Sequence, residues 1–286
     1  MTLKKAYRIL FITILFMMLA VIFYALNVSK MKLTWGIMGF SVAVILSIFA
    51  VVLSINIVKH EKDIKNTTFL FTHRFEILDW FSFLSISLMA IFLLFTFVII
   101  PSNVDQYSMY PTLKPDDRVF VYHFQYEPKR NDIIMIRITK DSYPLVNDSM
   151  FYEYDKNRNL IGINPEIYFV KRVVGIPGDL VEFELLGSNY AVKINGSIVE
   201  TKYGEYYLVS IVEKNIMEQN LNANILKDDL FFAFGDNPNG FTYFDPVLQI
   251  NVDVNGSFDS RNYGAISKED ILGRVIYRIW PIGRVS

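Results

Sequence analysis

The 286-residue chain contains no cysteine and only three histidines. Without cysteine there can be no disulfide, no thiol nucleophile and no thiolate metal site, so a folded domain depends on its packed core. His60 and His73 lie between long apolar segments, which leaves His123 as the only histidine after residue 100. The sequence also lacks an H-E-x-x-H motif, so it has too few histidine and cysteine ligands for the zinc site of a metalloprotease. We expect neither a metal nor another cofactor.

Positive charge is also scarce after residue 100, where Asp and Glu outnumber Lys and Arg. A net negative charge does not attract nucleic acid or anionic lipid headgroups. Nucleic acid is therefore not an expected partner.

Apolar residues, in contrast, make up 52% of the chain, and three long apolar runs lie within the first hundred residues, at about 9–26, 33–57 and 80–100. Each run is long enough to cross a bilayer as a helix. The alternatives are buried core helices or, for the first run, a cleavable signal peptide. Three such runs in series favour a membrane anchor formed by residues 1–100.

Charged residues beside these runs predict the orientation of the anchor. Seven Lys and Arg flank the runs on the side of the N-terminus, and two lie in the opposite loop. The seven are Lys4, Lys5, Arg8, Lys59, Lys62, Lys65 and Arg74, and the two are Lys30 and Lys32. Because Lys and Arg favour the cytoplasmic side, we expect a multi-pass protein of the plasma membrane with residues 101–286 on the extracytoplasmic side.

Residues 101–286 show the alternating and continuous apolar patterns that are typical of β-strands. Asn195-Gly196 is a strong signal for a two-residue hairpin between 190–194 and 197–201. The other expected strands are 118–124, 132–138, 167–174, 180–185, 206–212, 230–234 and 271–280. The sequence thus predicts a mainly β fold, an antiparallel and barrel-like domain after three transmembrane helices, with two excursions of unassigned role at about 139–166 and 238–256.

A hydrolase needs a nucleophile and a base, and the base is the limiting residue in this chain. A Ser-His-Asp triad would have to use His123, which lies in a predicted strand and is expected to be structural. A lysine can replace histidine if burial lowers its pKa from ~10.4 toward neutrality. Lys171 lies in the apolar segment Ile167–Val174, although a strand lysine whose amine reaches solvent is the simpler interpretation of that residue alone.

Ser108 is the candidate nucleophile because of its position. It lies eight residues past the third apolar run, and at ~3.6 Å per residue this tether keeps it within roughly 29 Å of the membrane surface. Such a position suits a membrane-bound substrate.

The segment Ser108–Leu113 resembles the nucleophile motif of bacterial type I signal peptidases. Four further segments are similar to the family's motifs and follow in the family's order. They are Asp117–Val121, Lys171–Asp179, Gly235–Asn237 and Ser257–Arg261. The similarity extends from Ser108 to about Arg274.

The resemblance implies a serine endopeptidase that removes signal peptides through an acyl-enzyme. Ser108 would be the nucleophile and Lys171 the general base, with Ser257 orienting the lysine amine. Asp259 and Arg261 resemble the family's structural ion pair. The backbone N–H of Ser108 would form half of the oxyanion hole.

Two residues depart from the family's pattern. Gln106 stands where a small or hydroxylated residue is common, so its amide would have to complete the oxyanion hole. Phe169 stands where a tyrosine is common. With Met109, Leu113 and Val170, it would line a shallow apolar groove that admits small residues such as Ala at the first and third positions before the cut. These four residues fit a plain core position equally well.

The expected substrates are secretory preproteins, the lipid bilayer is the expected surroundings, and the export machinery is a candidate partner. The main alternative is a catalytically inactive, membrane-tethered β domain that binds exported chains. Intact Ser108 and Lys171 argue against it. Self-cleaving repressors would carry a DNA-binding module, and a signal peptidase of the endoplasmic reticulum type would have histidine in place of Lys171.

Overall fold

The computed structural model describes residues 3–25, 37–59, 72–155, 157, 159–245, 249–280 and 282–284. The chain forms two compact units. Unit 1 contains the residues up to Ile100 together with His123–Gln125, and unit 2 contains Pro101–Tyr122 and the residues from Tyr126 on. The loop lysines that entered the orientation argument, Lys30, Lys32, Lys62 and Lys65, lie outside the described residues.

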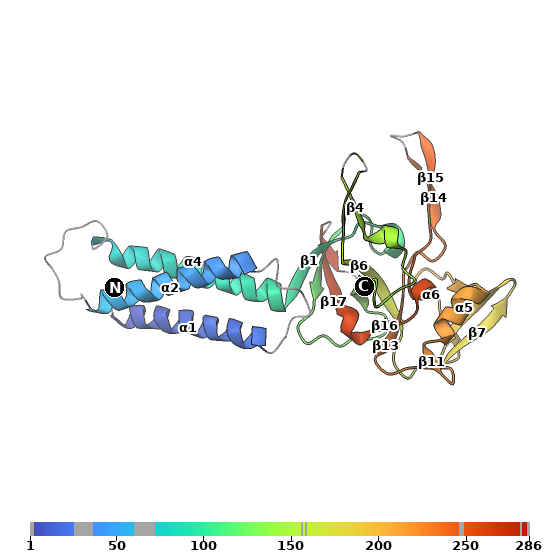
Figure 1. Ribbon diagram of the computed structural model, residues 1–286, viewed down its shortest axis with the longest axis horizontal. Coiled ribbons are helices and arrows are strands. Elements are labelled where there is room, and N and C mark those ends of the chain that lie inside the picture. Colours follow the sequence, from blue (N-terminus) through green and yellow to red (C-terminus); the bar gives the residue numbers. More distant parts are fainter. Residues whose placement is uncertain are drawn as a thin grey trace. The chain divides into compact units, whose positions relative to one another are not determined.

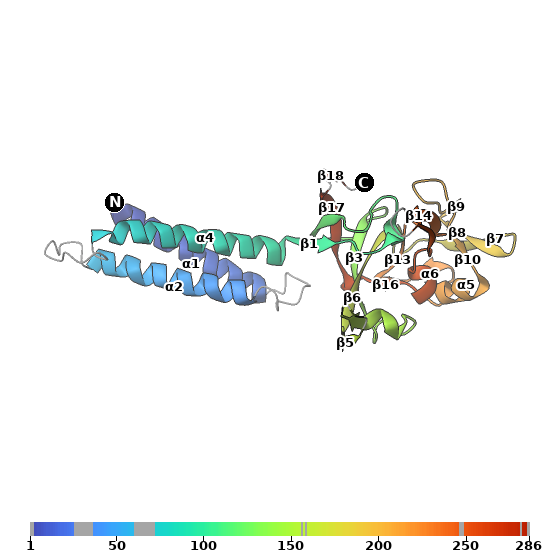
Figure 2. The same ribbon diagram turned by 90° about the horizontal axis from the view of Figure 1, so that it is seen from above.

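The described part of unit 1 contains the long helices α1 (Leu3–Ala25), α2 (Ile37–Lys59) and α4 (Arg74–Phe97), which lie side by side (Figures 1 and 2). Among the described residues, Phe75–Phe97 is long and apolar enough to span a membrane, whereas Tyr7–Leu19 and Val44–Ile57 are shorter apolar helical stretches. The structure therefore supports one candidate span and does not confirm the predicted three.

The third predicted span was placed several residues too late. Helix α4 begins at Arg74 and ends at Phe97, and the chain then becomes extended in strand β1 (Ile99–Asn103). β-branched residues such as Val98, Ile99 and Ile100 favour extended backbone, which explains the early end of the helix. A buried hydrogen bond between the Oγ atoms of Ser47 and Ser85, 2.5 Å long, joins α2 to α4.

Unit 2 is built on a sheet in the order β1-β2-β17-β3-β6-β13-β16, with β18 paired to β17. Its strands after β1 are β2 (Arg118–Tyr122), β3 (Ile133–Thr139), β6 (Glu166–Gly175), β13 (Leu230–Phe234), β16 (Ile266–Ser267), β17 (Ile271–Trp280) and β18 (Gly283–Arg284). The pairings from β2 to β16 are antiparallel. The predicted mainly antiparallel β domain is confirmed.

A second sheet contains β7 (Val181–Leu186), β8 (Asn189–Ile194), β9 (Ser197–Ile198) and β10 (Leu208–Val209). The predicted Asn195-Gly196 hairpin is confirmed, since both residues have the positive φ angles that its turn requires. The predicted strand 206–212 is largely wrong. Only β10 forms there, because Ser210 and Glu213 make a capping box that begins helix α5 (Ile211–Glu218).

Both excursions contain hairpins. Residues 139–166 form the short helix η3 (Asp148–Phe151) and the strands β4 (Tyr152–Tyr154) and β5 (Leu160–Ile163). Residues 238–256 form β14 (Phe241–Asp245) and β15 (Ile250–Val254). Figure 1 shows the two hairpins extending from the same side of unit 2. The remaining elements are η2 (Tyr107–Met109), β11 (Leu221–Asn222), β12 (Ile225–Leu226), α6 (Ser260–Tyr263) and η4 (Lys268–Asp270).

Strand β6 separates two apolar cores. Val173 packs in a core with Ile134 and Ala233, and Val174 packs in another with Phe232. Successive side chains of a strand point to opposite faces. Lys171 therefore shares the face of Val173, and its neighbour Arg172 lies on the other face.

Candidate active site

The turn that carries Ser108 is held by Asn237, which follows strand β13. The backbone N–H of Asn237 donates a hydrogen bond to the Ser108 carbonyl oxygen at 3.1 Å, and its side-chain amide donates to the Tyr107 carbonyl oxygen at 3.2 Å. Within the turn, the Tyr110 N–H donates to Tyr107 and the Leu113 N–H to Met109. Two consecutive carbonyl groups around Ser108 are thus fixed by one residue.

Lys171 lies in β6 opposite Ile134 of β3, and it is only 2% exposed. Burial lowers its pKa to about 8; Asp259 and Asp236 work against this shift, and Arg261 adds to it. Its Nζ atom lies 5.4 Å from the centre of the Phe169 ring. Helix η2, which contains Ser108, packs against β6. A lysine in these surroundings is neutral over part of the mildly alkaline range.

Gly235 lies where three segments meet. A Cβ atom added at this position would overlap the carbonyl oxygen of Ser108 and the Oγ atom of Ser257. Only glycine, which has no Cβ, permits this close approach. The Ser108 turn and Ser257 therefore touch the same residue at the end of β13.

Ser257 is buried, and its Oγ atom has no hydrogen-bond partner among the described residues. Its N–H donates to the Asn237 carbonyl oxygen at 2.8 Å. Within the described chain, no hydrogen bond joins the Lys171 amine to Ser108 or Ser257. Ser257 thus lies near the Ser108 turn, as an orienting residue should, but its hydroxyl forms no hydrogen bond with the Lys171 amine in this structure.

Asp259 and Arg261 form a buried ion pair with two hydrogen bonds, 2.9 Å and 3.0 Å long. Asp259 also accepts a hydrogen bond from the Gly235 N–H at 2.9 Å. Burial acts to raise the pKa of Asp259, but the charge and hydrogen bonds of Arg261 bring it below its ordinary value. This pair connects α6 to the glycine that Ser108 and Ser257 contact.

A second buried ion pair was not predicted from the sequence. Arg172 donates two hydrogen bonds to Asp236, 2.8 Å and 2.7 Å long, and the Thr112 hydroxyl donates to the same carboxylate at 2.5 Å. The pair therefore connects β6 to the chain that follows the Ser108 turn. The sequence signal for this pair is that Arg172 and Asp236 belong to Lys171–Asp179 and Gly235–Asn237, two segments that resemble family motifs.

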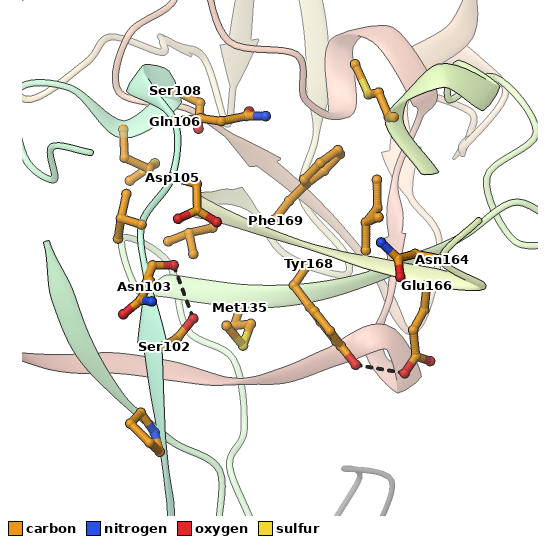
Figure 3. Close-up of a pocket in the computed structure, with 16 residues that line it drawn as sticks. Ser102, Asn103, Asp105, Gln106, Ser108, Met135, Asn164, Glu166, Tyr168 and Phe169 are labelled. Atoms are coloured by element: carbon orange, nitrogen blue, oxygen red, sulfur yellow. Dashed lines mark hydrogen bonds between the residues drawn. The ribbon is translucent and has the colours of Figure 1, made fainter. Parts of the chain in front are cut away.

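A cavity of about 650 Å³ leads to Ser108. Residues 101–106, 108 and 109 line one part of the cavity, and Asn164 and residues 166–170 line another. Figure 3 shows Gln106 and Ser108 together at one end and Asn164 and Glu166 at another. Met109, Phe169 and Val170 line the cavity as expected, whereas Leu113 is fully buried and does not line it.

His123 is buried and does not line the cavity. Burial lowers its pKa to about 4, so its imidazole is neutral at physiological pH. In the described part of the chain, no group of three or more His, Asp or Glu residues is arranged to hold a metal ion.

Residues 77–241, more than half of the chain, match the family described as "Signal peptidase, peptidase S26". The chain belongs to this signal peptidase family. The match includes Ser108, Lys171 and Gly235, and it ends before Ser257. Family membership confirms the predicted resemblance and the predicted class of enzyme, a peptidase.

Two curated relatives agree with the signal peptidase family. Signal peptidase IB of Staphylococcus aureus (strain COL) is 25% identical over 218 residues, which cover 72% of this chain and 91% of that protein. Signal peptidase I of Leptolyngbya laminosa is 29% identical over 198 residues, which cover 67% and 73% of the two chains.

Proposed function

We propose that the chain performs signal peptide cleavage with Ser108 as nucleophile and Lys171 as general base. The observation that carries this proposal is the buried Lys171 amine, with a pKa lowered to about 8, beside the turn that contains Ser108. A protonated lysine cannot accept a proton, so the base must be neutral when it works. A buried lysine lowers the free energy of unfolding, so a catalytic role explains why one is present at this position.

The reaction proceeds in two steps. Neutral Lys171 takes the proton of the Ser108 hydroxyl while Oγ attacks the carbonyl carbon of the scissile peptide bond. The C–N bond then breaks, the released amine of the mature chain receives the proton, and the signal peptide remains as an ester on Ser108. Water activated by Lys171 hydrolyses this ester and restores the free hydroxyl.

The surrounding residues serve these two steps. The Ser108 N–H and the Gln106 side-chain amide donate to the oxyanion that forms in each step. Ser257 orients the Lys171 amine once a substrate is bound, since its buried hydroxyl lies at the same glycine as the Ser108 turn. Asp259 and Arg261 hold this glycine in place through the Asp259 to Gly235 hydrogen bond.

The residues before the cut bind in the cavity as an extended chain. Strand β6 pairs with β13 only from Arg172 on, so residues 167–171 have one edge without a paired strand in the described structure. A substrate can pair with this edge through backbone hydrogen bonds, which are indifferent to its sequence. Met109, Phe169 and Val170 then select small side chains such as Ala at the first and third positions before the cut.

Unit 1 is proposed to be a multi-pass anchor in the plasma membrane, with unit 2 on the extracytoplasmic side. The apolar helices α1, α2 and α4 and the seven-to-two distribution of basic residues support this arrangement. The buried contact of Ser47 with Ser85 is of the kind that joins helices within a bilayer. Preproteins are the substrates, and the export machinery is a candidate partner.

Cleavage of a preprotein by the full-length protein in detergent tests the dyad. Ser108→Ala and Lys171→Arg should each lower kcat at least about a thousandfold, because nucleophile and base act as a unit and a guanidinium stays protonated. Ser102→Ala is the matched control, since Ser102 lines the same cavity, and it should retain most activity. Appreciable turnover by Ser108→Ala would refute the dyad, and an inactive parent protein would favour the alternative of a binding domain without catalysis.

A further inference from the structure

The β14–β15 hairpin is rooted in the active site. It begins after Asn237, which holds the Ser108 turn, and it ends before Ser257, whose N–H is bonded to the Asn237 carbonyl oxygen. The two strands form a sheet of their own, so in the described structure each has an edge without a neighbouring strand. The hairpin therefore extends directly from the residues that hold the Ser108 turn.

Aromatic contacts join the hairpin to the Ser108 turn. The ring of Phe241 stacks on Tyr110 with 4.5 Å between centroids and meets Tyr107 edge-on at 5.5 Å. Tyr243, two residues farther along the same face, lies 6.2 Å from Tyr107. Tyr107 and Tyr110 flank Ser108 on either side, so the hairpin base packs on the turn itself.

Phe241, Tyr243, Val252 and Val254 lie on one face of the hairpin, here called its apolar face, and at the far end of this face the register pairs Ile250 with Asp245. Tyr107 contacts Phe241 and Tyr243, and Tyr110 contacts Phe241. Ile250, the residue of this face farthest from the base in β15, is 52% exposed. The opposite face carries Thr242 and Asp253, which are hydrogen-bonded to each other, and Phe244, which is 56% exposed.

The cavity and the hairpin approach Ser108 through different residues. The residues that line the cavity come from segments 101–109, 135, 150 and 164–170, and none comes from the described part of the hairpin. Pro101, at one end of the cavity wall, follows helix α4 by only a few residues. In the proposed reaction the signal peptide, whose apolar stretch precedes the cut, fills the cavity, and this leaves the hairpin beside the Ser108 turn for the chain after the cut.

We propose that the apolar face of the β14–β15 hairpin binds the first residues of the mature chain, immediately after the cut, in extended conformation. This inference rests on the proposed cleavage reaction. An unfolded, extended polypeptide suits the site because it can pair with an open strand edge of the hairpin through backbone hydrogen bonds. Every second side chain of the added strand then lies on the apolar face. Five residues per strand at ~3.3 Å each give a length of roughly 17 Å, enough for about five residues of the mature chain.

Two peptides that share the residues before the cut test this inference. One continues for two residues after the cut and the other for eight. The full-length parent should cleave the longer peptide with a higher kcat/KM. Ile250→Ser should lower kcat/KM for the longer peptide roughly three- to tenfold, through KM, and leave the shorter peptide unchanged, because one buried aliphatic contact is lost. Phe244 is similarly exposed on the opposite face, so Phe244→Ser should leave kcat/KM for both peptides equal to that of the parent.

Three results would overturn the inference. They are equal cleavage of both peptides by the parent, no effect of Ile250→Ser on the longer peptide, and an equal effect of Ile250→Ser on both. The last result is expected if lipid or a second copy of the chain covers this face. The Ser108→Ala variant distinguishes failure of the dyad from failure of the hairpin proposal. If Ser108→Ala still cleaves the shorter peptide, the dyad is refuted, whereas the comparison of the two peptides tests the hairpin alone.

Discussion

If the Lys171 amine is the proposed base, it has opposite effects on activity and on stability. Its folded-state pKa of about 8 lies below the ordinary value of 10.5, chiefly because of burial. The folded protein therefore binds this proton less tightly than the unfolded chain does. Below pH 8 the full penalty of this shift opposes folding, it decreases as the pH rises from 8 to 10.5, and it is absent above that range. If Lys171 is the proposed general base, catalysis needs its neutral form and thus retains a residue that destabilises the fold.

Two measurements follow from this balance. The kcat/KM of the parent should rise with pH through about 8 and then level off, because in the proposed dyad only free enzyme with a neutral Lys171 is active. Lys171→Met should be inactive, and at neutral pH it should melt at the same temperature as the parent or higher. Lys129→Met, at an exposed lysine, should change neither profile. A rate that rises only near pH 10, together with a less stable Lys171→Met, would contradict the proposed base.

Lys171 shows how far single residues could be predicted. Its sequence neighbours alone favoured a strand lysine whose amine reaches solvent, and its burial was expected only together with the family resemblance; in the structure Lys171 is buried. The contact of Gly235 with both Ser108 and Ser257 was not predictable, because it depends on how three distant segments approach one another. Leu113 was expected to line the groove, but as a fully buried side chain it packs inside the domain. An apolar residue near a nucleophile has the same sequence signature in either position.

Strand β6 and the end of β13 are joined by the Arg172–Asp236 ion pair, which makes this junction sensitive to mutation. Both side chains are largely buried, and the Asp236 carboxylate also accepts from Thr112. Asp236→Ala should therefore destabilise unit 2 by about 3–5 kcal/mol, because the Arg172 charge remains buried without its partner. Thermal unfolding of the full-length protein in detergent measures this loss.

A double variant and an exposed pair control this prediction. Arg172→Met combined with Asp236→Leu should recover much of the loss, because no buried charge remains. Lys193→Ala, which removes the more exposed pair of Lys193 with Glu184, should cost less than about 1 kcal/mol. If Asp236→Ala cost no more than Lys193→Ala, the buried pair would not be what joins the two strands.

The elements that the sequence predicted well are those with local signals. Continuous apolar runs gave strands at 230–234 and 271–280 with the observed bounds, and Asn195-Gly196 gave its hairpin. Helix α5 was missed because the apolar residues Ile211 and Val212 outweighed the Ser210 to Glu213 capping signal. The β14–β15 hairpin was missed because Phe244 interrupts its alternation, and because it packs on Tyr107 and Tyr110, more than a hundred residues earlier.

The whole molecule gives a prediction of topology. If unit 1 is the proposed multi-pass anchor, residues 60–73, between α2 and α4, lie in the cytoplasm and the residues after Pro101 lie outside. Protease added to intact cells without their outer barriers should then cut in the excursion at 139–166 and spare 60–73. Permeabilised cells should lose both regions and serve as the control. Cleavage at 60–73 in intact cells, with 139–166 protected, would reverse the orientation and refute the export function.

The bonded ends of the β14–β15 hairpin also bear on how this domain tolerates changes in chain length. The hydrogen bond between Asn237 and Ser257 brings the two ends within 2.8 Å, so the residues between them form a closed branch. Lengthening such a branch adds only about 0.6 kcal/mol of closure entropy per doubling. The segment is thus an insertion point at which evolution or an engineer can exchange whole modules while Asn237 and the Ser108 turn that it holds stay in place.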